Sequence, residues 1–151
     1  MSQYVPSIEQ LVTEIFVRDM RRSADLYCGL GFALLRDGGD FVELTWEDHR
    51  LFLAELSALQ GIQHAELSAP PKFPLANLRV MVPNVDDYWR LANQIAPRII
   101  VPIGDRYYGL RDFTIADPDG FGIASRLTCR PKSGNKNQES WLIQVDIDIY
   151  A

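Results

Sequence analysis

The sequence predicts an α+β fold in which two copies of one unit, strand–helix–three strands, form an open, cup-shaped mixed sheet. Three observations lead to this prediction. At two places along the chain, a segment that alternates between apolar and polar residues like a strand is followed by a helical stripe of apolar residues. The two copies keep one register, because Val17-x-Asp19-Met20 and Val82-x-Asn84-Val85 are offset by 65 positions. A chain of 151 residues can also bury about two-thirds of its unfolded surface, which supports a core without disulfide bridges.

The first unit begins with a strand over Leu11–Arg18, because Val, Ile, Phe and Thr favour a pleated surface. Asp19 can cap the helix that follows. Gly29 and Gly31 end that helix. Its apolar stripe is Met20, Ala24, Tyr27 and Leu30. Polar turns then separate three predicted strands at Phe32–Arg36, Phe41–Trp46 and Leu51–Leu56.

The second unit follows a Pro-rich linker over residues 58–75. A strand is predicted at Asn77–Val82, and either Asn84 or Asp86 can cap the next helix. Pro97 ends that helix. Its stripe is Val85, Trp89, Ala92 and Ala96. Three further strands are predicted at Arg98–Val101, Leu110–Ala116 and Phe121–Arg126.

Residues 1–127 are therefore interpreted as one domain, with modules at about 10–57 and 76–127. Residues 128–151 differ in character. A polar stretch precedes Trp141–Tyr150, which alternates cleanly between apolar and polar side chains. We expect this extra C-terminal strand to add to a sheet edge, in this subunit or in a partner.

Composition narrows the classes of partner. Asp and Glu outnumber Lys and Arg by 20 to 15, and no basic run occurs, which argues against nucleic acid as a partner. A cationic small molecule suits an acidic protein better. The absence of a long apolar run and of a recognisable signal, with only two cysteines, predicts a cytoplasmic protein without a membrane span.

Two groups of residues carry a family resemblance over about residues 10–127. The first is Val17-Arg18-Asp19-Met20 with Ser23, Tyr27, Gly31 and Phe32, and the second is Tyr108–Phe113 followed by Asp117-Pro118-Asp119-Gly120. This pattern resembles the vicinal-oxygen-chelate superfamily of glyoxalases, dioxygenases and bleomycin-resistance proteins. The resemblance implies a cup made from two modules, often completed across a homodimer.

The resemblance also implies where metal-using relatives hold their ion. The matching positions here are Val12, Asn77 and Ala124, of which two lack a ligand atom and one offers a weak amide donor. His49 and His64 stand alone and are interpreted as surface residues. We therefore predict no metal and no cofactor, closest to the metal-free bleomycin-resistance-like branch, although a site rebuilt from other residues stays open.

Strand parity selects the side chains that face the cup. If Ile15 and Val17 pack under the first helix, Val12, Glu14 and Phe16 face the cup. The same argument, together with the aromatic residues near strand ends and turns, gives these predicted ligand-binding residues: Glu14, Trp46, Phe52, Arg79, Met81, Tyr108, Asp112 and Thr114. Arg111 completes the set, although its charge would compete with a cationic ligand if it points inward. The alternative is that Glu14 and Arg79 form an ion pair with each other and have no role in ligand binding. By resemblance, Tyr108 matches an aromatic residue that holds the flat part of bleomycin, with simple packing as the alternative.

Two functions follow from these residues. The first is a protein that sequesters a cationic or aromatic compound and makes or breaks no bond. The second is a superfamily enzyme that uses a displaced metal, or Glu14 or Asp112 as a general base. We favour binding, because the expected ligand positions lack donors. Cys28, in the first helix, is interpreted as a packed thiol.

Overall fold

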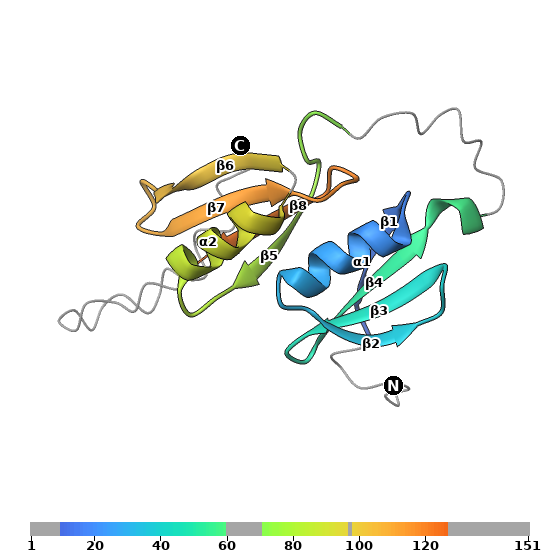
Figure 1. Ribbon diagram of the computed structural model, residues 1–151. Helices are drawn as coiled ribbons and strands as arrows, with labels where there is room; N and C mark the ends of the chain where they lie inside the picture. The colour runs from blue at the N-terminus through green and yellow to red at the C-terminus, as the bar shows by residue number, and fades with distance from the viewer. Residues whose placement is uncertain (1–9, 60–70, 97, 127–151) are drawn as a thin grey trace.

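A computed structural model describes residues 10–59, 71–96 and 98–126, and it confirms the predicted α+β fold (Figure 1). Two modules with the same order of elements follow each other along the chain. The first contains β1 (Thr13–Val17), α1 (Met20–Gly29), β2 (Ala33–Asp37), β3 (Phe41–Trp46), β4 (His49–Glu55) and the 3-10 turn η2 (Leu56–Ala58). The second contains β5 (Asn77–Met81), α2 (Val85–Ile95), β6 (Arg98–Asp105), β7 (Arg111–Ala116) and β8 (Gly122–Arg126).

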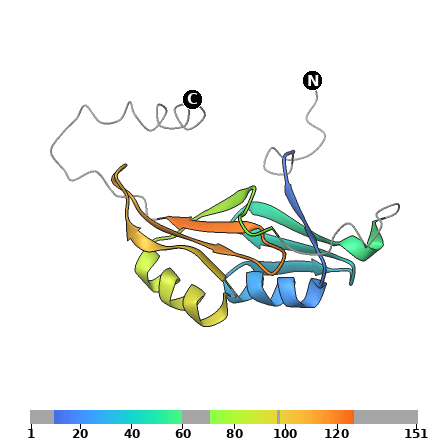
Figure 2. The same ribbon diagram turned by 90° about the horizontal axis from the view of Figure 1, so that it is seen from above.

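Each module forms a four-stranded mixed sheet with the same topology. The strand orders are β1-β4-β3-β2 and β5-β8-β7-β6, and the first pair in each sheet is parallel. Figure 2 shows that α1 and α2 lie on the same side of the two sheets. No helix of the described residues covers the opposite side, and we call it the helix-free face.

Both helices begin where the sequence predicted. The Asp19 carboxylate accepts a hydrogen bond from the Arg22 amide at 3.0 Å, so it caps α1. Asn84, rather than Asp86, caps α2, because its side-chain oxygen accepts from the amides of Asp86 and Asp87. The repeat offset of 65 residues is therefore kept by the two capping residues themselves.

The core lies between the helices and the sheets. Ile15 and Val17 are buried under α1, as strand parity predicted, and Phe113 and Ile115 are buried in the second module. The stripe of α2 needs one correction, because Tyr88 is more deeply buried than the predicted Trp89, which is only half-buried.

Two strands extend beyond their predicted limits by two residues or more. β6 continues past Val101 to Asp105, although Pro102 lies within it, since β6 is an edge strand whose register with β7 shifts. β4 begins at His49 instead of Leu51, because Glu47 adopts φ 50° in a tight turn that lets Trp46 pair with His49. His49 is thus the first residue of a strand and not part of the turn.

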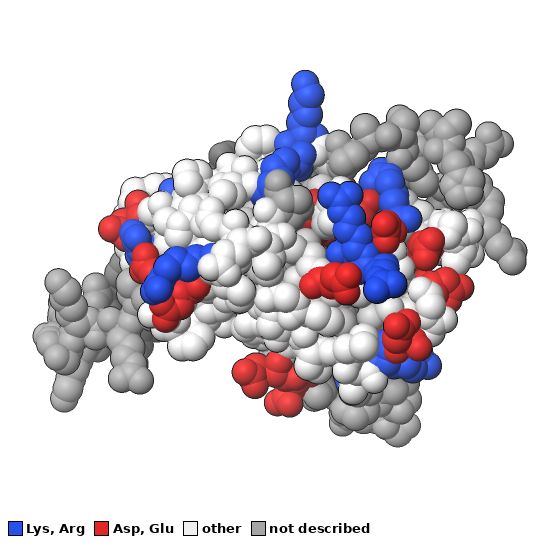
Figure 3. All heavy atoms as spheres, in the orientation of Figure 1, with Lys and Arg blue, Asp and Glu red and all other residues white. Residues whose placement is uncertain are grey.

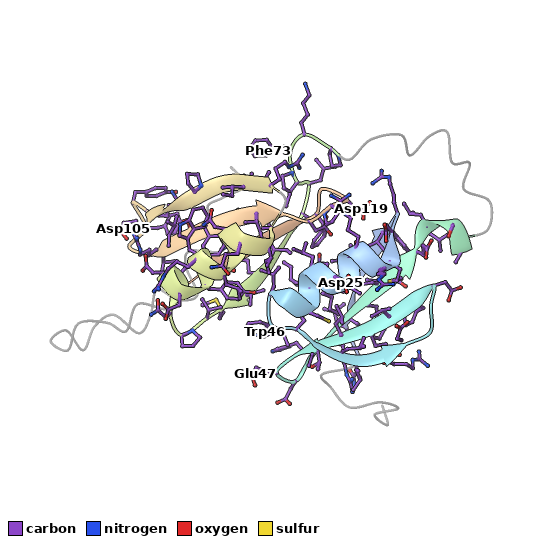
Figure 4. The ribbon with its side chains drawn as sticks, viewed as in Figure 1. Asp25, Trp46, Glu47, Phe73, Asp105 and Asp119 are labelled. Atoms are coloured by element: carbon purple, nitrogen blue, oxygen red, sulfur yellow. The ribbon has the colours of Figure 1, made fainter. Side chains whose placement is uncertain are left out.

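Side-chain contacts join the two modules. The buried Tyr27 hydroxyl donates to Oδ2 of Asp117 at 3.0 Å. Arg18 forms an ion pair with Asp119 at 2.6 Å, close to the start of α1 (Figure 4). The Tyr88 hydroxyl donates to the Leu30 carbonyl at 2.7 Å. The Asp117–Gly120 turn of the second module is therefore fixed to the β1–α1 region of the first.

No helix among the described residues is long and apolar enough to cross a membrane. The predicted C-terminal strand and His64 lie outside the described residues.

Candidate functional site

On the helix-free face of the first module, one row of side chains crosses all four strands. Glu14 pairs in register with Phe52, Phe52 with Glu43, and Glu43 with Arg36. Arg36 forms an ion pair with Glu43 at 2.5 Å. Glu14 is exposed and makes no hydrogen bond or ion pair within the described part of the chain. The row therefore ends in a carboxylate that is available to a ligand or a partner.

A second row adds aromatic surface beside the first. Phe16 is 46% exposed, and its register partner Ala54 pairs in turn with Phe41. The rings of Phe41 and Phe52 meet edge to face, with centroids 5.2 Å apart. Arg36 lies 5.8 Å from the Phe41 centroid, within cation–π range. This half of the face therefore presents three phenylalanines next to an unpaired acid.

The second module presents smaller side chains at the equivalent positions. Arg79 replaces Glu14 in the repeat and pairs with Ala124, which pairs with Thr114. Met81 replaces Phe16 and is 44% exposed. Arg79, like Glu14, makes no ion pair within residues 10–59, 71–96 and 98–126, so the alternative of a Glu14–Arg79 pair is not formed within the chain. This half therefore carries a basic charge over a floor of small residues.

Asp112, near the start of β7, accepts hydrogen bonds from two neighbouring side chains. The Nε of Arg106 donates to one carboxylate oxygen at 2.5 Å, and the Tyr108 hydroxyl donates to the other at 2.6 Å. The Arg106 pKa is raised, chiefly by its hydrogen bond with Asp112. Tyr108 is 37% exposed, so its ring remains accessible while its hydroxyl is occupied.

Two predicted site residues lie apart from this face. Trp46 packs against Phe32 and Tyr88 at the seam between the modules (Figure 4), with ring centroids 5.2 and 6.0 Å away. It lines a cavity of about 260 Å³ that Arg79 also borders. Arg111 forms ion pairs with Asp86 in the first turn of α2 and with Asp105, and these raise its pKa. The structure thus brings Glu14 and Phe52 together, and Tyr108 and Asp112 together, but separates Trp46 and Arg111 from both pairs.

The residues at the expected metal positions do not fit a metal centre. Val12 and Ala124 have no donor atom. The Asn77 side chain lies across Gly122, because its Oδ1 stands 1.8 Å from where a Cβ on that glycine would be. No group of three or more His, Cys, Asp or Glu side chains able to hold a metal occurs among the described residues.

Two neighbours of the site, Phe16 and Arg106, were not among the predicted ligand-binding residues. Strand parity had placed Phe16 on the cup side with Glu14, and the structure confirms that placement. Arg106 had no such signal, because it lies in the β6–β7 turn and reaches Asp112 only through the geometry of that turn. Cys28 was predicted to be packed, and this was wrong, since it is exposed near the end of α1.

The fold and part of the sequence match known proteins. A family model described as the Glyoxalase/Bleomycin resistance protein/Dioxygenase superfamily matches residues 8–124. No curated protein matches the sequence. Among solved structures, a protein of unknown function from Agrobacterium tumefaciens is 23% identical, with a TM-score of 0.65, and the match covers 83% of this chain and 98% of that one.

Two bleomycin-related structures also match. A bleomycin resistance determinant encoded on transposon Tn5 is 17% identical with a TM-score of 0.58, and the match covers 80% of this chain and 98% of that one. A bleomycin-binding protein in complex with bleomycin is 17% identical with a TM-score of 0.57, covering 80% and 99% of the two chains. At these identities the likeness concerns the fold.

Proposed function

The chain belongs to the glyoxalase/bleomycin resistance protein/dioxygenase superfamily, and we propose that it binds a small cationic or aromatic compound on its helix-free face without a protein-bound metal ion. Such a protein sequesters its ligand and makes or breaks no bond. The observation that carries the proposal is the aromatic half of that face, where Phe16, Phe41 and Phe52 share one side of the sheet with the unpaired carboxylate of Glu14.

The chemistry of these side chains fits a flat or positively charged ligand. Aromatic faces stack on planar groups and attract cations, and a desolvated pairing of a cation with a carboxylate adds directional strength. Tyr108 offers an accessible ring in the second module, with its hydroxyl fixed on Asp112. Superfamily members described as bleomycin-binding and as a bleomycin resistance determinant share the fold, which supports this class of ligand.

Metal independence is supported by the donor atoms present. Val12, Asn77 and Ala124 supply at most one weak ligand, whereas a catalytic divalent ion needs about three protein ligands. The alternative function, an enzyme, required Glu14 or Asp112 to act as a general base inside an apolar cup. Glu14 is exposed, and both oxygens of Asp112 already accept hydrogen bonds, so neither is a free carboxylate enclosed in an apolar cup.

We further propose a homodimer that closes the cup between two helix-free faces. The halves of the face are complementary, since one carries large rings with Glu14 and the other carries small residues with Arg79. A twofold axis places the first module of one copy against the second module of its partner. Glu14 of one copy and Arg79 of the partner subunit would then face each other across the cup, with the ligand's cation bound between them at Glu14. The cytoplasmic location expected from the sequence stays a prediction.

Titration with metal-free bleomycin, followed by tryptophan fluorescence, tests the binding proposal. We expect saturable quenching with about one drug per cup, and weaker binding for Phe16→Ala and Tyr108→Ala. Ile99→Ala is the matched control, because Ile99 is similarly exposed but pairs with the buried Ile115 and so lies on the helix side of β6. No response up to high micromolar drug rejects this ligand, and stoichiometric Zn, Ni, Mn or Fe in the purified protein contradicts metal independence.

Charge reversal tests the dimer separately. Glu14→Arg or Arg79→Glu alone should weaken association in sedimentation equilibrium, because each places like charges opposite one another. The double exchange should restore it. A protein that stays monomeric at all concentrations, or that ignores the single reversals, contradicts the proposed pairing.

A further inference from the structure

A second hollow lies on the other side of the first sheet, between α1 and the edge strand β2. It has a volume of about 640 Å³, and we call it the α1–β2 groove. Its wall is one face of α1, carrying Arg21, Ala24, Asp25 and Cys28 at helical spacing. Its floor includes Leu34 of β2 and Val42 of β3, both on the helix side of the sheet.

The groove exists because the two helices sit differently on their sheets. α2 packs over β6, β7 and β8, whereas α1 packs chiefly on β3 and β4. The edge strand β2 is therefore left uncovered, and Leu34 is 53% exposed there. An apolar side chain beside a concavity of drug-like size is typical of a ligand site.

The charges in the groove favour a cation. Four carboxylates line it, from Asp19, Asp25, Asp37 and Glu55, against the guanidinium groups of Arg18 and Arg21. Arg18 is already paired with Asp119, which does not line the groove. Figure 3, which views this side, shows acidic and basic side chains gathered around α1.

Asp25 is the carboxylate best placed to meet a ligand. Asp19 caps α1, Asp37 accepts from the Gly39 amide, and Glu55 accepts from the Ser57 hydroxyl. Asp25 makes no hydrogen bond or ion pair within the described part of the chain, and Figure 4 marks it on α1. Its neighbour Cys28 has a raised pKa, caused by burial and then by the Asp25 charge.

We infer that the α1–β2 groove is a second ligand site that takes an organic amine, with the ammonium group at Asp25 and the apolar body over Leu34 and Val42. This site is separate from the helix-free face, because none of the residues that line it belongs to the rows around Glu14 or Arg79. The inference goes beyond the proposed function and does not depend on it.

Cys28 provides a probe within the groove itself. In a Cys129→Ser background, the rate of alkylation by iodoacetamide reports on access to Cys28. Three probes of matched shape are compared: 4-phenylbutylamine, 4-phenylbutan-1-ol and 4-phenylbutyrate. We expect saturable protection by the amine, weaker protection by the alcohol and none by the carboxylate, because only the amine satisfies both the carboxylate and the apolar floor.

Variants separate the two parts of the site. Asp25→Asn should weaken protection by the amine about threefold to tenfold, and Leu34→Ala should weaken protection by both amine and alcohol. Protection is expressed as a ratio of rates with and without probe, since Asp25→Asn also changes the basal reactivity of Cys28. Asp48→Asn, a turn carboxylate outside the groove, and Phe16→Ala, on the other face, should leave the ratio unchanged.

Three results would overturn the inference: no protection by the amine, equal protection by amine and carboxylate, or an unchanged ratio in Asp25→Asn. Thermal unfolding of each variant confirms that it is folded before alkylation is compared. Bleomycin binding at the helix-free face is measured in the same proteins, so failure of one site is distinguished from failure of the other.

Discussion

The buried contact between Tyr27 and Asp117 gives a prediction about how the modules hold together. Tyr27→Phe removes the hydroxyl that donates to Asp117 at 3.0 Å and leaves the ring in place. Asp117 is 3% exposed, so it cannot replace this donor with bulk water. It keeps two backbone donors, from Asp119 at 2.9 Å and Phe121 at 2.8 Å, both on the other oxygen.

The expected cost follows from leaving one oxygen of a buried carboxylate without its donor. Such losses typically cost about 1–3 kcal/mol, and we expect about 2 kcal/mol here, since the second oxygen stays satisfied. For a chain of this size that corresponds to a fall in Tm of about 4–8 °C. Urea unfolding followed by far-UV circular dichroism and by tryptophan fluorescence measures the free energy with two probes.

Tyr107→Phe is the matched control, because its side chain is fully exposed and its hydroxyl makes no hydrogen bond among the described residues. It should leave the free energy of unfolding unchanged. If Tyr27→Phe also lies within about 0.5 kcal/mol of the wild type, the hydroxyl does not stabilise the junction and the reasoning is refuted.

The Asp117 carboxyl group should make the free energy of unfolding depend on pH in a predictable direction. The pKa of Asp117 is raised above its ordinary 3.8, chiefly by burial, so the folded state prefers the protonated form. Its contribution to stability is therefore complete below that ordinary value and is lost as the pH rises through the folded pKa. Asp117→Asn keeps an acceptor for both amides and should remove this loss. Relative to the wild type, the variant should gain stability as the pH rises above about 4, and a constant difference would contradict the assignment.

Three further predictions concern other parts of the molecule. Gly122→Ala should destabilise by about 1–3 kcal/mol in thermal unfolding, since the new Cβ would meet the Asn77 side chain and the Ala76 carbonyl, and adding Asn77→Ala should recover only part. Tyr88→Phe should cost about 1 kcal/mol in urea, as it removes the buried bond to Leu30, and an unchanged midpoint would count against that bond. Without any ligand, Cys28 should react with iodoacetamide more slowly than a thiol in a short peptide at pH 7.5, and Asp25→Asn should speed the reaction because the raised pKa falls.

Local pattern determined much of the fold. Alternation along β1 and β7 placed Ile15 and Phe113 in the core, because successive strand residues must point to opposite faces. Asp19 and Asn84 were identifiable as capping residues, because a side-chain acceptor before an apolar stripe satisfies free helical amides. The duplication was predicted because the capping positions and the order of elements recur 65 residues apart.

Tertiary structure alone decided which of these side chains meet. Parity placed Glu14 and Arg79 on one face, but they are on separate sheets and do not pair within the chain. Arg106 reaches Asp112 only because the β6–β7 turn folds back, and Tyr27 meets Asp117 only because two modules pack together. The α1–β2 groove depends on where a helix rests across its sheet. Sequence periodicity fixes the direction of a side chain relative to its own element, whereas these contacts depend on the positions of elements relative to one another.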